Sequence, residues 1–172
     1  MKANIKMFAD DAKMSGPVNC AADQEILQED LKRLQSWTDD WLLRFNTAKC
    51  KVLHLGYHNK NLDYHMSEGE VTRTLETTKC EKDLGVYVDP SLKFTQHCQK
   101  AAGKANRLVG LIRRSFSYLD GPMMVKLFKA LVRPHLENAN VVWSPQLKKD
   151  SALLESVQRR ASHKAHTRTE TS

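Results

Sequence analysis

Residues 23–45, DQEILQEDLKRLQSWTDDWLLRF, form the most regular amphipathic pattern in this sequence of 172 residues. Apolar side chains recur here at spacings of three and four, which is the period of an α-helix with one buried face. Asp23 is a candidate N-cap, and we expect Trp37 and Trp41 to belong to the core rather than to a cofactor site. The apolar positions are Ile26, Leu27, Leu31, Leu34, Trp37, Trp41, Leu42 and Phe45.

Short strand patterns lie on both sides of this helix. The run IKMFADDAKMSG (5–16) predicts two short strands joined by a tight turn that carries Asp10 and Asp11. A long helix combined with several short, antiparallel strands indicates an α+β fold. The further patterns are a buried strand at KCKVLHLG (49–56), a hairpin over 62–77 with its turn at 68–70, and a strand at KDLGVYVD (82–89) that ends at Pro90.

The remainder of the chain is predicted to be helical. Helices are expected over 97–116, over 121–133 and near 150–162, and Pro134 is expected to end or kink the second of them. The tail HKAHTRTETS (163–172) has no periodicity and is expected to be disordered. The predicted core positions of these helices are Ala101, Ala105, Leu108, Ile112, Phe116, Met124, Leu127, Phe128, Leu131, Leu153, Leu154 and Val157.

Positive charge is concentrated in the second half of the chain. Residues 1–86 hold 12 Lys and Arg against 14 Asp and Glu, a formal charge of −2, whereas residues 87–172 hold 15 against 6, a formal charge of +9. This asymmetry fits a polyanionic partner such as nucleic acid, and a merely solvated basic helical surface fits it as well. Within the predicted helix 97–116, a basic stripe lies about 120° from the apolar face at 100° per residue. Its members are Lys100, Lys104, Arg107 and Arg114.

The sequence argues against several other classes of protein. No apolar run is long enough to span a membrane, and the start lacks the apolar middle of a secretory signal, so we expect a nuclear or cytoplasmic protein that is not secreted. The four cysteines have no zinc-site spacing and are expected to be free thiols. His54 and His58 are four residues apart, but His54 falls on a predicted strand rather than a helix, and both are interpreted as surface histidines.

Two adjacent aspartates at a hairpin tip can bind a divalent metal, although such pairs are also common in ordinary loops. The sequence around them, FADD (8–11), resembles the metal-binding turn of reverse transcriptases. Later segments resemble, in order, the reverse transcriptases of non-LTR retrotransposons of the jockey and chicken-repeat type, from Lys6 to about Ser162. These segments are LQSWTDDWLLRFNTAKCKVLHLG (34–56), EKDLGVYVDPSLKFTQH (81–97), NRLVGLIRRSF (106–116), DGPMMVKLFKALVRPHLENANVVWSP (120–145) and LKKDSALLESVQRRAS (147–162).

The resemblance implies roles for individual residues. Asp10 and Asp11 would be the Mg²⁺-binding catalytic aspartates, and Phe8 would pack near the primer end. Lys49 would lie near the incoming triphosphate as a proton donor to pyrophosphate, or would be a solvated lysine beside a strand. The implied primer-grip residues are Leu84, Gly85 and Val86, and the implied contacts with nucleic-acid phosphates are Lys100, Lys104, Arg107, Arg113 and Arg114.

Departures from the family pattern limit what this chain is expected to do. The fingers and the first catalytic aspartate of these enzymes precede the FADD turn, and only seven residues precede Phe8 here. We therefore expect a partial palm over 1–92 and a helical thumb over 93–162, in a truncated RNA-directed DNA polymerase that is inactive by itself. The alternatives are a non-catalytic nucleic-acid-binding segment with RNA template and DNA primer as partners, and an inert remnant of a mobile element.

Overall fold

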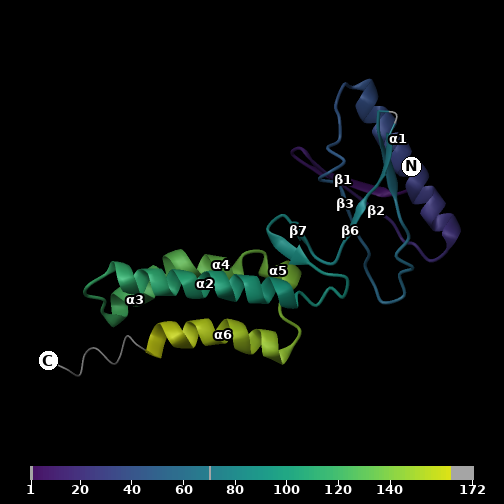
Figure 1. The fold of residues 1–172 in the computed structure, drawn as a ribbon. Helices are drawn as coiled ribbons and strands as arrows, with labels where there is room; N and C mark the ends of the chain where they lie inside the picture. The colour runs from purple at the N-terminus through teal and green to yellow at the C-terminus, as the bar shows by residue number, and fades with distance from the viewer. Residues whose placement is uncertain (1, 70, 164–172) are drawn as a thin grey trace. The chain divides into compact units, whose positions relative to one another are not determined.

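The structure, a computed structural model, describes residues 2–69 and 71–163, which fall into two compact units. The first unit is Met1–Cys80 and the second is Glu81–Ser172. Both combine short strands with helices, so the predicted α+β class is confirmed (Figure 1). The division lies at residues 80 and 81 rather than at the expected residue 92, which places the strands near residue 85 with the helices.

The elements follow the chain in a simple order. The first unit contains β1 (Asn4–Phe8), β2 (Asp11–Ser15), α1 (Ala21–Asp40), β3 (Lys51–Leu53), β4 (His65–Glu68), β5 (Val71–Thr74) and β6 (Glu76–Thr78). The second contains β7 (Glu81–Asp83), β8 (Val86–Val88), α2 (Thr95–Ser115), α3 (Gly121–Leu127), the π-helix η1 (Phe128–Val132), α4 (Arg133–Glu137), α5 (Asn140–Trp143) and α6 (Lys148–His163). None of the described helices combines the length and the apolar character needed to cross a membrane.

The first unit is built around one face of α1. Leu27 and Leu31 on this helix are buried against Tyr64, Met66 and Leu75. The unit also contains three two-stranded sheets, of which the pairs β1–β2 and β4–β5 are antiparallel as predicted. The pair β3–β6 is parallel, which corrects the expectation of antiparallel strands alone. Segment 54–75 supplies the crossover of about a dozen or more residues that a parallel pair requires.

Glutamine side chains of α1 take the place of a neighbouring strand along one edge of β4. The amide of Gln28 donates to the carbonyl of His65 at 2.8 Å and accepts the N–H of His65 at 2.9 Å. Gln35 pairs with the backbone of Ser67 in the same two-way manner. Alternate residues of a strand present their backbone groups on one edge, so these amides cover an edge that would otherwise be open.

The helix α1 ends at Asp40 and not at residue 45 as predicted. The N–H of Leu42 donates to the carbonyl of Asp39 at 3.0 Å, and the N–H of Leu43 donates to that of Thr38 at 2.8 Å. These two bonds form a Schellman motif, which normally has glycine at the left-handed position. Here Leu42 occupies it with φ of +57°. The apolar pattern therefore continues beyond the end of the helix, and the sequence has no glycine to mark that end.

Other features predicted for this helix also differ from the structure. The N-cap is Cys20, and Asp23 lies inside the first turn, where its carboxylate accepts the N–H groups of Asn19 and Cys20 at 2.8 and 3.1 Å. These bonds hold the pKa of Asp23 below its usual value. Trp37 and Trp41 are 44% and 66% exposed, so the expectation that both belong to the core is wrong. The early end of α1 leaves Trp41 beyond the packed part of the helix.

The region around β3 is less regular than predicted. Only Lys51–Leu53 forms a strand within the predicted range 49–56. His54 is buried and not on the surface as expected: its ring lies 6.3 Å from that of Tyr64, and its Nε2 has no hydrogen-bond partner in the described part of the chain. The predicted hairpin that follows is confirmed as β4–β5, although Glu70 in its turn lies outside the described residues.

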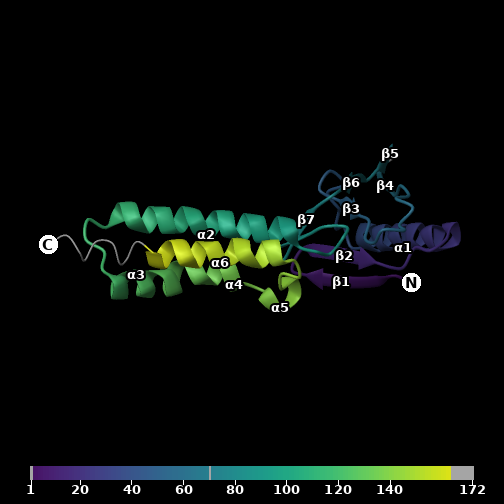
Figure 2. The same cartoon turned by 90° about the horizontal axis from the view of Figure 1, so that it is seen from below.

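The second unit is a helical bundle that carries the hairpin β7–β8. Helices α2 and α6 lie side by side, and α3, η1 and α4 pack along them (Figures 1 and 2). The helices predicted over 97–116 and 150–162 are confirmed as α2 and α6. Apart from His163, with which α6 ends, the predicted disordered tail lies outside the described residues. The buried core residues are Ala102, Ala105, Val109, Ile112, Met124, Val132, Val157 and Ala161.

The helix predicted to end or kink at Pro134 continues to Glu137. A π-helical segment, η1, precedes the proline, so Pro134 lies in the first turn of α4. Proline is tolerated in the first turn because its missing N–H does not break a hydrogen bond within that helix. The wider π turn also rotates the side chains. As a result Val132 is fully buried, whereas Leu131, predicted to be in the core, is 48% exposed.

Residues 82–89 form a hairpin and not the single strand predicted from KDLGVYVD. Strands β7 and β8 pair antiparallel, with Asp83 opposite Val86. The two residues between them, Leu84 and Gly85, have φ values of +45° and +90°. Positive φ at both central positions is the signature of the tight turn that suits the twist of paired strands.

Candidate nucleic-acid interface

The FADD turn forms the tip of the hairpin β1–β2. Phe8 is paired with Asp11 at the end of the ladder, so the two-residue loop consists of Ala9, with φ of +53°, and Asp10. Both aspartates are exposed, and neither carboxylate has a hydrogen bond or an ion pair with a described residue. Phe8 is 64% exposed. The predicted tight turn is present, but Asp11 lies on β2 rather than in the loop.

Lys49 is located apart from a strand, in the turn that precedes β3. Its backbone N–H donates to the carbonyl of Asn46 at 2.9 Å, and its side chain is exposed. No ion pair joins it to Asp10 or Asp11 in the described part of the chain. The structure therefore does not bring the three predicted catalytic side chains into direct contact.

Carboxylate oxygens are the ligands that Mg²⁺ prefers, and Asp10 and Asp11 are accessible to solvent. Within residues 2–69 and 71–163, no three His, Cys, Asp or Glu side chains are grouped so that they could hold a metal ion. Two adjacent carboxylates alone do not fit a two-metal centre, which needs further ligands. We therefore derive no catalytic step from this turn.

The hairpin β7–β8 places the predicted primer-grip residues in two different environments. Leu84 is 63% exposed at the tip in a left-handed backbone conformation, which costs a non-glycine residue about 1–2 kcal/mol. Gly85 next to it adopts φ of +90° without such a cost. Val86 is buried against Phe94 and Trp143. The tip thus presents Leu84 and the Gly85 backbone, while Val86 fixes the hairpin to the core.

An aromatic cluster fastens this hairpin to the first turns of α2. The N–H of Tyr87 donates to Nδ1 of His97 at 3.2 Å, and the His97 ring lies 4.5 Å from that of Trp143. Burial lowers the pKa of His97, which keeps its Nδ1 available as an acceptor. The indole N–H of Trp143 donates to the carbonyl of Asn138 at 2.6 Å. Trp143 is therefore a packing residue, and the cluster joins three segments that are distant in sequence.

Lys100 belongs to this cluster as well as to the basic stripe. Its Nζ lies 3.7 Å from the centre of the Tyr87 ring, within the range of a cation–π interaction. Helical spacing placed Lys100 on the basic stripe, and the resemblance implied a contact with phosphate. Neither could reveal the contact with Tyr87, because Tyr87 is on β8 and not on the same helix. A cation over an aromatic face keeps its charge, so Lys100 remains part of the positive surface.

The remaining basic residues of α2 separate into two groups. Lys104, Arg107 and Arg114 are exposed and have no hydrogen bond or ion pair with the described residues. Arg113 lies apart from them: it is half-buried, and its guanidinium donates to the carbonyl of Arg160 on α6. At 100° per residue Arg113 falls on the side of α2 that faces α6, whereas the other three share one stripe.

The second unit as a whole carries an excess of positive charge, which adds to the positive potential at this stripe. Residues 81–163 hold 14 Lys and Arg against 7 Asp and Glu. The acidic residues near α2 are engaged elsewhere: Asp150 is buried and accepts the hydroxyl of Thr95 at 2.8 Å, and Asp89 accepts the N–H of Ser91 at 2.8 Å. The stripe Lys104, Arg107 and Arg114 therefore has no carboxylate partner among the described residues.

Asp150 is the residue of this region that sequence reasoning missed. Its carboxylate lies at the start of α2, where the free N–H groups of a helix favour negative charge. Burial and the charge of Asp150 together raise the pKa of Cys98 to about 11. The signal in the sequence was slight, because an acidic residue near the start of α6 is also explained by capping of its own helix.

A scan against models of protein families and searches of curated proteins and of solved structures found nothing that matches this chain.

Proposed function

We propose that this chain is the palm-hairpin and thumb part of a reverse transcriptase of the non-LTR retrotransposon type, and that its own surface binds the backbone of a template–primer duplex. The observation that carries this proposal is the stripe Lys104, Arg107 and Arg114, whose cations are exposed, lie on one face of a long helix and have no ion pair with the residues that the structure describes. A row of cations can pair with the regularly spaced phosphates of a duplex, and such contacts do not depend on the base sequence.

Two hairpin tips support the polymerase part of the proposal. Asp10 is in the two-residue turn of one hairpin, with Asp11 next to it on β2, and Leu84 and Gly85 form the two-residue turn of the other. These are the segments that the sequence resemblance relates to the metal turn and the primer grip. The ancestral activity would be RNA-templated DNA synthesis, in which bound Mg²⁺ would activate the primer hydroxyl and stabilise the leaving pyrophosphate.

We expect the chain by itself to bind nucleic acid without extending a primer. Two-metal chemistry needs more carboxylate ligands than the adjacent pair Asp10 and Asp11 supplies. The test is a primer-extension assay with the purified chain, Mg²⁺, an RNA template and all four nucleotides. Template-directed extension that disappears in Asp10→Ala would overturn this expectation.

Binding is tested with a labelled RNA–DNA hybrid and two variants that lose the same charge. The stripe variant Lys104→Gln/Arg107→Gln/Arg114→Gln is compared with the control Lys32→Gln/Arg44→Gln/Lys60→Gln, whose residues are exposed in the first unit. We expect about a tenfold or larger loss of affinity for the stripe variant and little change for the control. Equal losses, or no binding by the natural sequence even at low salt, would refute the proposal and favour an inert remnant.

A further inference from the structure

The last turn of α6 carries a sequence that the proposed function does not use. Arg159, Arg160, Ala161 and Ser162 follow one another, so Ser162 has arginines three and two positions before it. Protein kinases that select basic substrates use acidic pockets to read cations at these positions, because the guanidinium pairs with carboxylates in a fixed geometry. The motif is therefore the chemical pattern of a phosphoacceptor serine.

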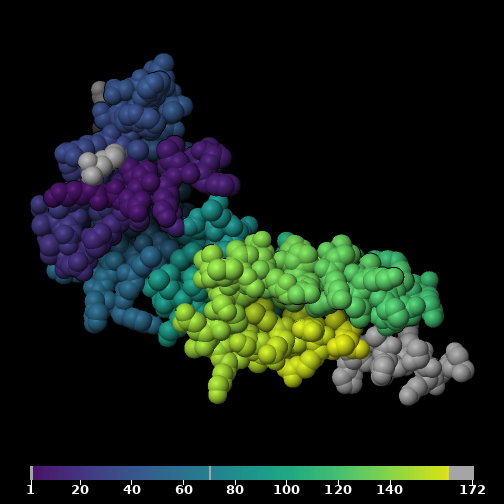
Figure 3. Space-filling view, turned by 180° about the vertical axis from the view of Figure 1, so that it is seen from behind, coloured from purple at the N-terminus to yellow at the C-terminus, as the bar shows by residue number. Residues whose placement is uncertain are grey.

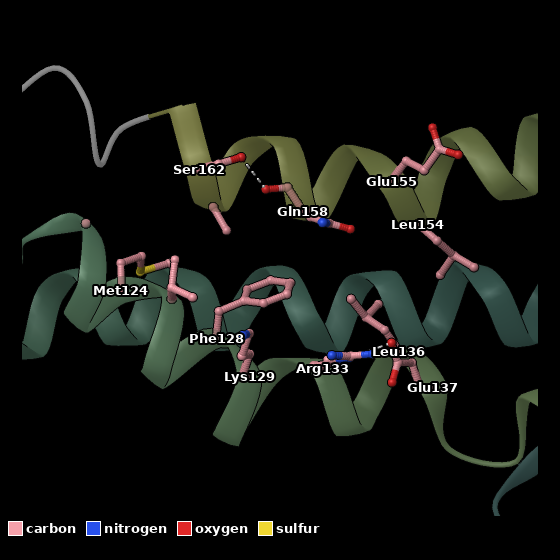
Figure 4. Close-up of a pocket in the computed structure, with 13 residues that line it drawn as sticks. Met124, Phe128, Lys129, Arg133, Leu136, Glu137, Leu154, Glu155, Gln158 and Ser162 are labelled. Carbon is pink, nitrogen blue, oxygen red and sulfur yellow. Dashed lines mark hydrogen bonds and ion pairs between the residues drawn. The ribbon is translucent and has the colours of Figure 1, made fainter.

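The structure places Ser162 where a kinase can reach it. Its side chain is exposed, and its hydroxyl donates to the carbonyl of Gln158 at 2.9 Å (Figure 4). The same hydroxyl lies 3.2 Å from the carbonyl of Arg159, so both bonds are within its own helical turn. Arg159 is exposed, and its guanidinium has no hydrogen bond or ion pair in the described part of the chain. Terminal helical turns open at little cost. Val157, which is fully buried, anchors α6 before the motif begins.

We propose that Ser162 is a phosphorylation site for an arginine-directed serine kinase that uses ATP. The Ser162 oxygen attacks the γ-phosphorus, a new O–P bond forms, and the bond from that phosphorus to the β,γ-bridging oxygen breaks to release ADP. The hydroxyl proton passes to the catalytic base of the kinase. The product carries about −1.5 to −2 charges at neutral pH beside three arginines. These arginines are Arg113, which donates to the carbonyl of Arg160, Arg160 itself and Arg159.

The added phosphate has a consequence for nucleic-acid binding, and this consequence rests on the proposed function. Ser162 is on α6, which lies along α2, the helix that carries the stripe (Figure 2); the view from behind shows α6 against the segment 121–137 (Figure 3). A phosphate here neutralises part of the positive charge of the second unit and pairs with nearby guanidiniums. Phosphorylation is therefore expected to weaken binding of a polyanion.

Other serines in this unit act as internal comparisons. Ser151 follows Lys148, Lys149 and Asp150, so it has lysines at the same two positions, but it is half-buried in the first turn of α6. Ser117 has Arg114 three positions before it and lacks a cation at the next position. Ser162 combines both arginines with an exposed hydroxyl at a helix end.

The experiment treats the full chain with the catalytic subunit of cyclic-AMP-dependent protein kinase and Mg-ATP, followed by intact mass measurement and peptide mapping. We expect one phosphoryl group on Ser162, no such product from Ser162→Ala, and an unchanged product from Ser151→Ala. Arg159→Gln is expected to slow the reaction about tenfold or more, as the loss of a charge-assisted hydrogen bond would. No incorporation, or equal incorporation into Ser162→Ala, would overturn the proposal.

A second measurement separates this proposal from the proposed function. The phosphorylated chain is expected to bind an RNA–DNA hybrid about tenfold more weakly than the untreated chain at moderate salt. If Ser162 is modified and the affinity does not change, the site stands and the expected effect of its phosphate on binding is wrong. If Ser162 is not modified while the stripe variant loses affinity, the phosphorylation site is wrong and the binding surface stands.

Discussion

Replacement of Trp143 by alanine is expected to destabilise the second unit by about 3–5 kcal/mol, the usual cost of removing a large buried aromatic side chain. Trp143 is only 2% exposed, contacts the His97 ring and donates its indole N–H to Asn138. A unit of this size has a free energy of unfolding of about 5–10 kcal/mol, so the loss would be a large share of it. The hairpin β7–β8 would lose its anchor at the same time, because Val86 packs on the same cluster.

The assay is denaturant unfolding followed by far-ultraviolet circular dichroism, with tryptophan fluorescence of the natural sequence as a second probe. Trp143 is the buried tryptophan, whereas Trp37 and Trp41 in the first unit are largely exposed. Trp143→Phe keeps aromatic packing and is expected to cost about 1–3 kcal/mol, because the Asn138 carbonyl loses its donor. The control Trp37→Phe is expected to change stability by less than about 0.5 kcal/mol. If Trp143→Ala were as stable as this control, the aromatic cluster would not support the second unit.

Two further predictions concern titratable groups. Exposed Cys20 is expected to react with a thiol reagent at pH 8. Cys98 is buried and has a pKa raised to about 11, so it is expected to react only as the second unit unfolds. Pulse labelling with mass mapping tests this, and rapid labelling of native Cys98 would contradict it. The backbone N–H groups of Ala3 and Lys2 lower the pKa of Asp30, so its carboxylate stabilises the first unit above the pKa of unfolded Asp30, and this stability is lost as pH falls through the lower folded value. Unfolding curves between neutral and acid pH are expected to show a weaker pH dependence for Asp30→Asn, and an identical dependence would refute the assignment.

The helices of the second unit could be predicted from sequence because their apolar period is regular and their cores are formed by small and aliphatic side chains. The π segment could not, since one additional residue per turn leaves no compositional mark apart from the proline that follows it. The end of α1 was missed for a related reason: Leu42 occupies a position where the sequence pattern expects glycine. The pairing of Gln28 and Gln35 with β4 could not be predicted either, because the apolar pattern of α1 does not show what its polar side chains contact.

The candidate site was predicted unevenly. The turns at Asp10 and at Gly85 were visible as local patterns, and the stripe of Lys104, Arg107 and Arg114 follows from helical spacing. The turn at Gly85 is held in place by contacts between Tyr87 and residues from other parts of the chain. Residue spacing within one helix or strand cannot reveal such contacts. Such long-range contacts decide which predicted cations remain free.

The salt dependence of binding to an RNA–DNA hybrid tests the central claim most directly. Each neutralised phosphate contributes about 0.7–0.9 to the slope of log affinity against log salt concentration, so the stripe should contribute about 2–3. We predict that the natural chain has a slope at least that steep and that Lys104→Gln/Arg107→Gln/Arg114→Gln removes about this amount. A slope that the stripe variant leaves unchanged would contradict the claim that these three cations contact the duplex backbone.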